Sequence, residues 1–215
     1  GLAVALAGLG MVTANAQQGC APSGPFRDWV LGSVGSAQRV VIAIDNSGSV
    51  QEANRLPTEK QCAIAIVQIL SGKQFAILSF NSSVSVVQGL TTNTNTLINA
   101  INSIQDTRNN TLMDGAIDDA CQFTQPVRPN GALVLETDGI PTASRRPTDP
   151  LTAAQQAAAN FRANCSTLAV IGVDLGGDAR ARDFLHSIAD AFIEVPKNVP
   201  TLTEWGLIAL AVLLA

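Results

Sequence analysis

The chain has 215 residues and a formal net charge of −4, and 47% of its residues are hydrophobic, which is enough to bury the core of one domain. Only 4% of the residues are aromatic, there is no tyrosine, and no extended run of Lys or Arg occurs. This composition argues against nucleic-acid binding, which needs a basic face or a platform of stacked aromatic rings.

The first 16 residues, GLAVALAGLGMVTANA, are small, apolar and uncharged, and they end in the A-x-A pattern Ala14-Asn15-Ala16. This pattern is typical of a secretory signal peptide, here without its basic start, and a buried N-terminal helix is the alternative. We therefore expect an exported protein whose mature chain begins near Gln17, with an N-terminal segment over 17–35 before the main domain.

Strand and helix patterns alternate through residues 36–196. Six short apolar runs predict strands at 40–44, 75–80, 84–87, 132–135, 168–173 and 192–195. Apolar residues at helical spacing predict helices over 56–70, 97–104 and 113–120. Two further helices are predicted, one starting with a capping box of Thr152 and Gln155 and the last one capped by Asp178. The stretch Gln88 to Thr96 is expected to be a loop and a helix cap.

This alternation predicts an α/β domain with a single doubly wound, mostly parallel six-stranded sheet and helices on both faces. The runs 75–80 and 84–87 are joined too closely for a parallel crossover, so one edge strand should be antiparallel.

Three oxygen-rich segments are expected at the carboxyl edge of this sheet, where α/β proteins bind ligands. They are Asp45-Asn46-Ser47-Gly48-Ser49 after the first strand, Thr111 before a helix, and Thr137-Asp138-Gly139 after a later strand. Two carboxylates and three hydroxyls suit a hard divalent cation, Mg²⁺ or Mn²⁺ in preference to Ca²⁺, with a coordination position left open. The alternative is that Ser47 and Ser49 only cap a helix and Asp45 binds loop amides.

The order Asp45-x-Ser47-x-Ser49, then Thr111, then Thr137-Asp138-Gly139 resembles the von Willebrand factor A domain over roughly residues 36–196. The resemblance implies a metal-ion-dependent adhesion site, as in integrin inserted domains, with Ser47, Ser49 and Thr111 contacting the metal. Asp45 and Asp138 would bind it directly or through water, and a carboxylate of a partner protein would fill the open position. The chain departs from the family pattern at Asn109-Asn110, where the family often has two glycines.

Several other acids are expected to have ordinary roles. Asp114, Asp118 and Asp119 should start a helix and face solvent, and Asp174 and Asp178 should form a turn and a cap, with a second cation there as the alternative.

The four cysteines, Cys20, Cys62, Cys121 and Cys165, are an even number in a chain that we expect to be exported, which favours two disulfides. Three pairings are open, and the spacing excludes a zinc ribbon. Since Cys121 and Cys165 both lie near the ends of predicted helices, we expect them to pair and Cys20 to pair with Cys62.

The segment 197–215 contains VPTLTEWG, which resembles the IPTLxxWG C-terminal sorting signal of exported Gram-negative proteins, with Val199 in place of Ile. The resemblance implies recognition by an envelope sorting enzyme of the exosortase type. The apolar run 206–215 is too short to span a bilayer, so it is either a buried helix or part of a segment that anchors transiently in a membrane.

These features predict an exported binding module of the periplasm, the outer surface or the medium, which engages an acidic group of a protein partner through its metal. An envelope assembly factor and a metal-dependent hydrolase or phosphatase are the alternatives. Catalysis is disfavoured because the lone histidine, His186, should face solvent and because Ser47 stands where an aspartyl phosphatase has a second acid.

Overall fold

The structure is a computed structural model that describes residues 19–107 and 109–197. The expected signal peptide and the expected C-terminal sorting segment lie outside the described residues, apart from Lys197. No helix among the described residues is both long and apolar enough to cross a membrane.

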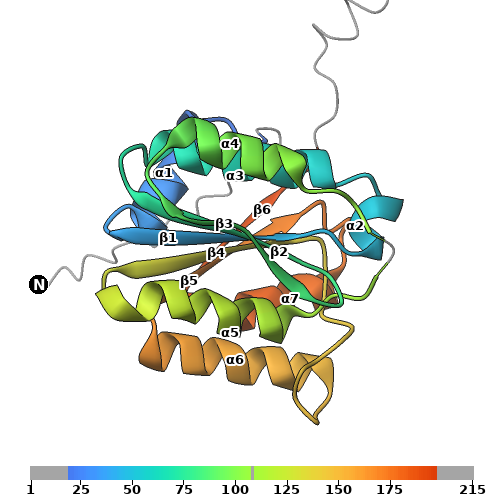
Figure 1. The fold of residues 1–215 in the computed structure, drawn as a ribbon. Coiled ribbons are helices and arrows are strands. Elements are labelled where there is room, and N and C mark those ends of the chain that lie inside the picture. The colour runs from blue at the N-terminus through green and yellow to red at the C-terminus, as the bar shows by residue number, and fades with distance from the viewer. Residues whose placement is uncertain (1–18, 108, 198–215) are drawn as a thin grey trace, which may run out of the picture.

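A six-stranded sheet in the order β3-β2-β1-β4-β5-β6 forms the centre of the fold (Figure 1). Its strands are β1 (Arg39–Asp45), β2 (Gln74–Phe80), β3 (Val84–Thr91), β4 (Gly131–Thr137), β5 (Thr167–Val173) and β6 (Ala191–Val195). All neighbouring strands are parallel except β2 and β3, which are antiparallel. The predicted fold class, with its single antiparallel edge strand, is confirmed.

Helices cover both faces of the sheet (Figure 1). They are α1 (Gly24–Val34), α2 (Gly48–Glu52), α3 (Leu56–Ile69), α4 (Thr94–Ser103), α5 (Met113–Thr124), α6 (Pro150–Asn164) and α7 (Ala179–Ile188), with a 3₁₀ turn over Gln125–Val127. Helices α1, α3 and α4 pack on one face, and α5, α6 and α7 pack on the other. The central strands are therefore buried on both sides, which explains why their sequences show no polar alternation.

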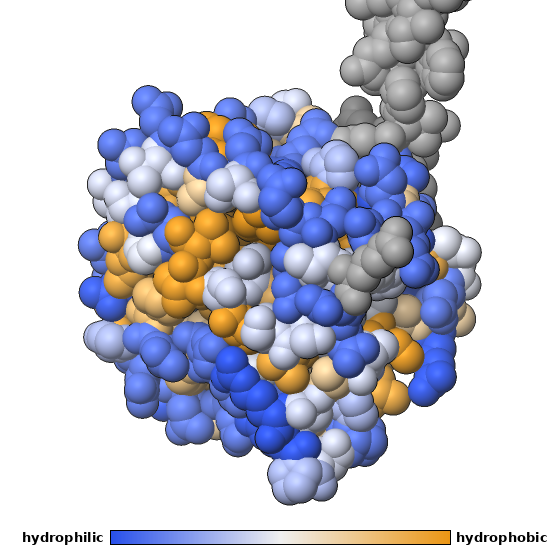
Figure 2. Space-filling model, turned by 45° about the vertical axis from the view of Figure 1, so that its right-hand side comes forward, coloured by the Kyte–Doolittle hydropathy of each residue, from blue (hydrophilic) through white to orange (hydrophobic). Residues whose placement is uncertain are grey.

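The edge strand β3 is the part of the sheet that helices cover least. Val86 is 57% exposed, and Val84, Val87 and Leu90 are half-buried. In the view of Figure 2, apolar surface gathers in a strip between two hydrophilic regions on the side where β3 lies.

Two helices were not predicted from the sequence. Helix α1 lies in the segment 17–35, and its residues Phe26, Val30 and Val34 pack into the same core as α3. Their spacing of four residues is helical, and Trp29 packs against the same core, but the helix is short and its apolar pattern is weak. Helix α2 has five residues and follows Ser47 directly, which is too short for a periodic signal.

Two local predictions were wrong. Helix α6 begins at Pro150, and Asp149 accepts the N–H of Thr152, so Asp149 is the N-cap in place of the predicted Thr152 capping box. A proline at the first helical position and an aspartate before it form the stronger start signal. Strand β3 also extends to Thr91, and Asn93 caps α4, so the predicted loop over 88–96 is shorter.

The structure forms the two disulfides in the expected pairing, Cys20–Cys62 and Cys121–Cys165. The first ties the segment before α1 to α3, and the second ties α5 to the end of α6. Each disulfide thus braces one of the two helical layers.

The chain order reverses between β1 and β4, because β1 leads outward to β2 and β3 on one side while β4, β5 and β6 follow on the other. Loops on the two sides of such a switch point diverge and leave a crevice at the carboxyl edge of the sheet. Asp45 ends β1 and Asp138 follows β4, so both flank this switch point.

Candidate metal centre

Asp45 is fixed by hydrogen bonds at both carboxylate oxygens. Its Oδ1 accepts the backbone N–H of Ser47 at 2.9 Å, and its Oδ2 accepts the hydroxyl of Thr137 at 2.8 Å. The side chain is fully buried at the end of β1. Thr137 is not among the predicted ligands, and in the structure it orients Asp45 from the neighbouring strand.

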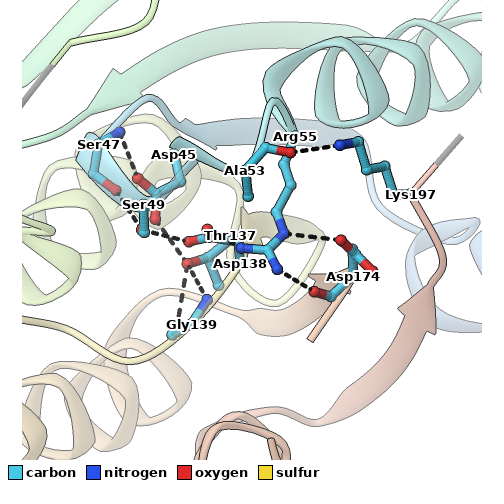
Figure 3. A network of polar contacts seen from close by, with 10 residues as sticks. All are labelled: Asp45, Ser47, Ser49, Ala53, Arg55, Thr137, Asp138, Gly139, Asp174 and Lys197. Carbon is cyan, nitrogen blue, oxygen red and sulfur yellow. Dashed lines mark hydrogen bonds and ion pairs between the residues drawn. The ribbon is translucent and has the colours of Figure 1, made fainter. Parts of the chain in front are cut away.

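The side chains of Ser47 and Ser49 lie next to each other, and Ser49 contacts Asp138 (Figure 3). Their Oγ atoms are 3.3 Å apart, and the hydroxyl of Ser49 donates to Asp138 Oδ1 at 2.8 Å. Ser47 occupies the N-cap position of α2, but its side chain makes no capping hydrogen bond. The capping alternative therefore does not account for the side chain of Ser47, and the hydrogen bond from Ser49 to Asp138 joins the loop after β1 to the loop after β4.

Thr111 is positioned by its backbone. The N–H of Gly48 donates to the carbonyl of Asn109 at 2.8 Å, which ties the loop before Thr111 to the loop that carries the two serines. The N–H of Thr111 donates to the hydroxyl of Thr142. Leu112 is the N-cap of α5, so Thr111 lies one residue before it. The hydroxyl of Thr111 makes no hydrogen bond with another described residue, so it remains available to a ligand.

The loop 141–149, which includes Thr142, is clamped to α5 through Asp114. One oxygen of this carboxylate accepts from the Ser144 hydroxyl, the Arg145 backbone N–H and the Arg146 guanidinium, at 3.0 to 3.1 Å. Asp114 is fully buried, so the prediction that it faces solvent was wrong. Asp118 and Asp119 pair with the same two arginines.

Arg55 is a residue of this site that the sequence analysis missed. Its Nη1 lies 2.8 Å from Asp138 Oδ2, and its Nε lies 3.2 Å from Asp174 Oδ2 (Figure 3). Asp174 was predicted to form a turn, with a second cation as the alternative, and in the structure a guanidinium occupies this place. The available signal was a lone basic residue directly before a helix, where the helix dipole disfavours a positive charge.

Acidic side chains are concentrated in this region. Burial raises the pKa of Asp45 to about 7, and the charge of Asp138 adds to the effect. Two further acids, Glu59 on α3 and Glu136 on β4, are fully buried with no hydrogen-bond partner for either oxygen. Burial raises the pKa of both carboxyls well above the usual range. The raised pKa values favour the neutral forms of Glu59 and Glu136, and a bound cation would offset the charges of Asp45 and Asp138.

The donor types of the five predicted ligands are those that a hard divalent cation prefers. Asp45, Ser47, Ser49 and Asp138 are linked directly, and Thr111 is tied to their loop through Asn109. Among the described residues no three His, Cys, Asp or Glu side chains are grouped so that they could hold a metal ion. The ligand set therefore depends on hydroxyls beside two carboxylates, a donor type that suits Mg²⁺ and Mn²⁺.

His186 lies on the exposed side of α7, with its ring centroid 4.6 Å from that of Phe192. Within the described part of the chain it makes no hydrogen bond to Ser47 or Ser49, so the structure shows no serine–histidine pair there.

Two family models match the sequence. Residues 40–140 match the von Willebrand factor type A domain, and this range contains all five predicted ligands. Residues 199–215 match the IPTL-CTERM motif. No curated protein matches the chain.

Solved structures with the same fold include a pilus tip protein domain, a mussel byssus protein and a pilus adhesin. The vWF domain of the type V pili tip protein Mfa5 from Porphyromonas gingivalis has a TM-score of 0.65 at 15% identity, covering 82% of this chain and 95% of that domain. Proximal thread matrix protein 1 of the mussel byssus, with a zinc-occupied MIDAS motif, has a TM-score of 0.60 at 17% identity over 75% of this chain. The pilus adhesin SpaC from Lactobacillus rhamnosus GG has a TM-score of 0.61 at 15% identity over 82% of this chain.

The chain spans 44% of the mussel protein and 30% of SpaC. At these identities the likeness establishes the fold, which is that of a von Willebrand factor A domain.

Proposed function

We propose that this protein is an exported cell-envelope binding module that holds Mg²⁺ or Mn²⁺ and uses it to engage an acidic group of a protein partner. Asp45, Ser47, Ser49, Thr111 and Asp138 would hold the ion, and the ion would supply a Lewis-acidic position for an oxygen ligand from outside. The observation that carries the proposal is the hydrogen-bonded group of Asp45, Ser47, Ser49 and Asp138 at the switch point of the sheet, with the loop before Thr111 bonded to Gly48 through the carbonyl of Asn109.

The donor set explains why the ligand would be acidic. Only Asp45 and Asp138 bring negative charge, while the three hydroxyls are neutral, so a divalent ion keeps part of its positive charge. A carboxylate from the partner would complete the neutralisation. The protein carries a net charge of −4, so the metal is needed to attract such a partner.

Adhesion or another protein–protein interaction is favoured over catalysis by the architecture of the site. Ser47 and Ser49 contact each other and Asp138, and neither is paired with a histidine that would activate it as a nucleophile. The match at 199–215 to the C-terminal motif, together with the pilus-tip and adhesin structures of the same fold, supports a location at the cell envelope.

The test is a competition for the open metal position. With Mn²⁺ added to the full chain, a short peptide containing one Glu should displace Mn²⁺-bound water and lower the water-proton relaxation rate. The same peptide with Gln should have no effect, because a neutral amide is a weaker ligand for a hard cation. An equal response to both peptides, or none to either in the metal-loaded protein, would refute the carboxylate mechanism.

A further inference from the structure

Arg55 forms an ion pair inside the candidate centre. Besides Nη1 with Asp138 and Nε with Asp174, its Nη2 donates to the backbone carbonyl of Asp174 at 2.7 Å. The guanidinium thus bridges the ends of β4 and β5, as Figure 3 shows. The side chain of Arg55 is 19% exposed and that of Asp138 is 2% exposed, so solvent screens this pair less than a surface pair.

The backbone on either side of Arg55 is held firmly. Its N–H donates to the carbonyl of Val50 at 2.9 Å, and its own carbonyl accepts from Thr58 and Glu59 in the first turn of α3. The preceding turn is fixed by Lys197, whose Nζ donates to the carbonyl of Ala53 at 2.7 Å. The turn that positions the guanidinium beside Asp138 is therefore held by hydrogen bonds on both sides of Arg55.

The two oxygens of Asp138 are already shared. Oδ1 accepts from Ser49, and Oδ2 accepts from Arg55. A metal ion that binds Asp138 through Oδ2 must displace or share the guanidinium. Even an ion held through a water molecule meets a fixed positive charge on the same carboxylate. Arg55 therefore reduces the negative charge that a cation experiences at the centre.

We propose that Arg55 is an internal cation that competes with the divalent metal ion for Asp138 and so lowers the metal affinity of the centre. Arg55 stabilises the site when no metal is bound, and metal loading weakens its pairing with Asp138. This inference rests on the proposed metal-binding function and adds a control on that function. Arg55 is a positioning and tuning residue, since it acts through Asp138.

The test is a calorimetric titration of the full oxidised chain with Mn²⁺, in the wild type and in Arg55→Gln. Removing the positive charge should tighten Mn²⁺ binding by about tenfold or more, because like charges repel strongly where solvent screening is weak. In EDTA, the same variant should melt at a lower temperature than the wild type, because Asp138 and Asp174 lose their shared partner. An arginine with only a structural role would lower the melting temperature without tightening the binding of metal.

The matched control is Arg182→Gln, which removes a surface ion pair between α7 and β6. In this pair, Arg182 Nε lies 2.7 Å from Glu194 Oε2. The Mn²⁺ affinity of this variant should equal that of the wild type. If Arg55→Gln does not fold, Arg55→Lys keeps the charge without the planar fork, and its affinity should stay within about threefold of the wild type. A rise of tenfold in the Lys variant would overturn the proposal.

The outcomes separate this proposal from the proposed function. If the wild type and Arg55→Gln bind Mn²⁺ equally well, the proposed function stands and the role of Arg55 is refuted. If neither protein binds Mn²⁺, both proposals fail. If only the variant binds measurably, the competition is supported directly.

Discussion

Asp45 and Asp138, the two carboxylates of the candidate centre, have different partners and therefore different environments. The groups that donate to Asp45 in the described part of the chain are neutral, namely the amide of Ser47 and the hydroxyl of Thr137, and burial raises the pKa of Asp45 to about 7. Asp138 accepts from Ser49 and from the guanidinium of Arg55. An incoming cation would therefore gain most from Asp45, whose charge has no positive partner among the described residues.

Glu59 gives a prediction about stability and pH. Burial, reinforced by Asp45 and Glu136, holds its pKa well above the value of an unfolded chain. The folded state disfavours the charged carboxylate of Glu59, which lowers the free energy of unfolding. This loss of stability is absent below the unfolded pKa, near 4.5, and grows as the pH rises above it. Glu59→Gln should therefore raise the melting temperature at pH 7.5 by roughly 2–4 °C, equivalent to about 1 kcal/mol for a domain of this size. The gain should disappear near pH 4.

The control is Glu52→Gln, because Glu52 is exposed on α2 and its substitution should leave the pH dependence of the melting temperature unchanged. Thermal melts of both variants from pH 4 to pH 8 provide the measurement. A Glu59→Gln variant that is less stable than the wild type at pH 7.5 would contradict the prediction and show that the carboxylate is stabilised in its charged form.

The candidate ligand residues could be proposed from the sequence, whereas the residues that contact them could not. Asp45, Ser47, Ser49, Thr111 and Asp138 stand out because oxygen-bearing side chains follow buried strands or precede a helix. Arg55 belongs to no such pattern, since its partners Asp138 and Asp174 follow strands that are distant in the sequence. Contacts of this kind depend on how α3 is placed over the sheet.

At the scale of elements, the loop 141–149 and α5 form a clamp beside Thr111. Asp114 joins them through three donors on one buried oxygen, and Thr142 of the same loop accepts the N–H of Thr111. Thr111 therefore keeps its position only while this loop remains folded against α5.

Asp114→Ala should destabilise the domain by about 3 kcal/mol or more, because it leaves the guanidinium of Arg146 without its buried partner. Limited proteolysis should then cut the loop 141–149 faster than in the wild type. Asp119→Ala provides the comparison, since Asp119 pairs with the same loop through the more exposed Arg145. Asp119→Ala should lower the free energy of unfolding by at most about 1 kcal/mol. An equal loss in the two variants would contradict the proposed role of Asp114 in holding the loop.

Helices and strands were predicted correctly where the packing of the fold leaves a pattern in the local sequence. The parallel strands were recognised because burial on both faces requires continuous apolar runs, as in β1 and β4. Helix α2 was missed because it is held by the loop contacts of Ser47 and Gly48 and not by an apolar stripe. The start of α6 was misplaced because two capping signals competed within four residues and the earlier one was stronger.

For the whole molecule, the two disulfides crosslink the helical layers on opposite faces of the sheet. They close sequence separations of 42 and 44 residues, so chain entropy predicts nearly equal contributions of about 4 kcal/mol each. The double variants Cys20→Ala/Cys62→Ala and Cys121→Ala/Cys165→Ala should therefore lose similar free energies of unfolding in urea. A loss confined to one pair would show that the other adds little to the stability of the fold.

The central claim is that Asp45, Ser47, Ser49, Thr111 and Asp138 bind a divalent cation, and thermal denaturation of the full oxidised chain tests it most directly. Mn²⁺ or Mg²⁺ at about 100 times its Kd should raise the melting temperature over that in EDTA by roughly 5–10 °C, equivalent to about 2.7 kcal/mol. Asp45→Asn, which keeps the size of the side chain, should abolish the rise, whereas Asp28→Asn on the exposed surface of α1 should retain it. No rise in the wild type, or an equal rise in Asp45→Asn, would contradict the claim.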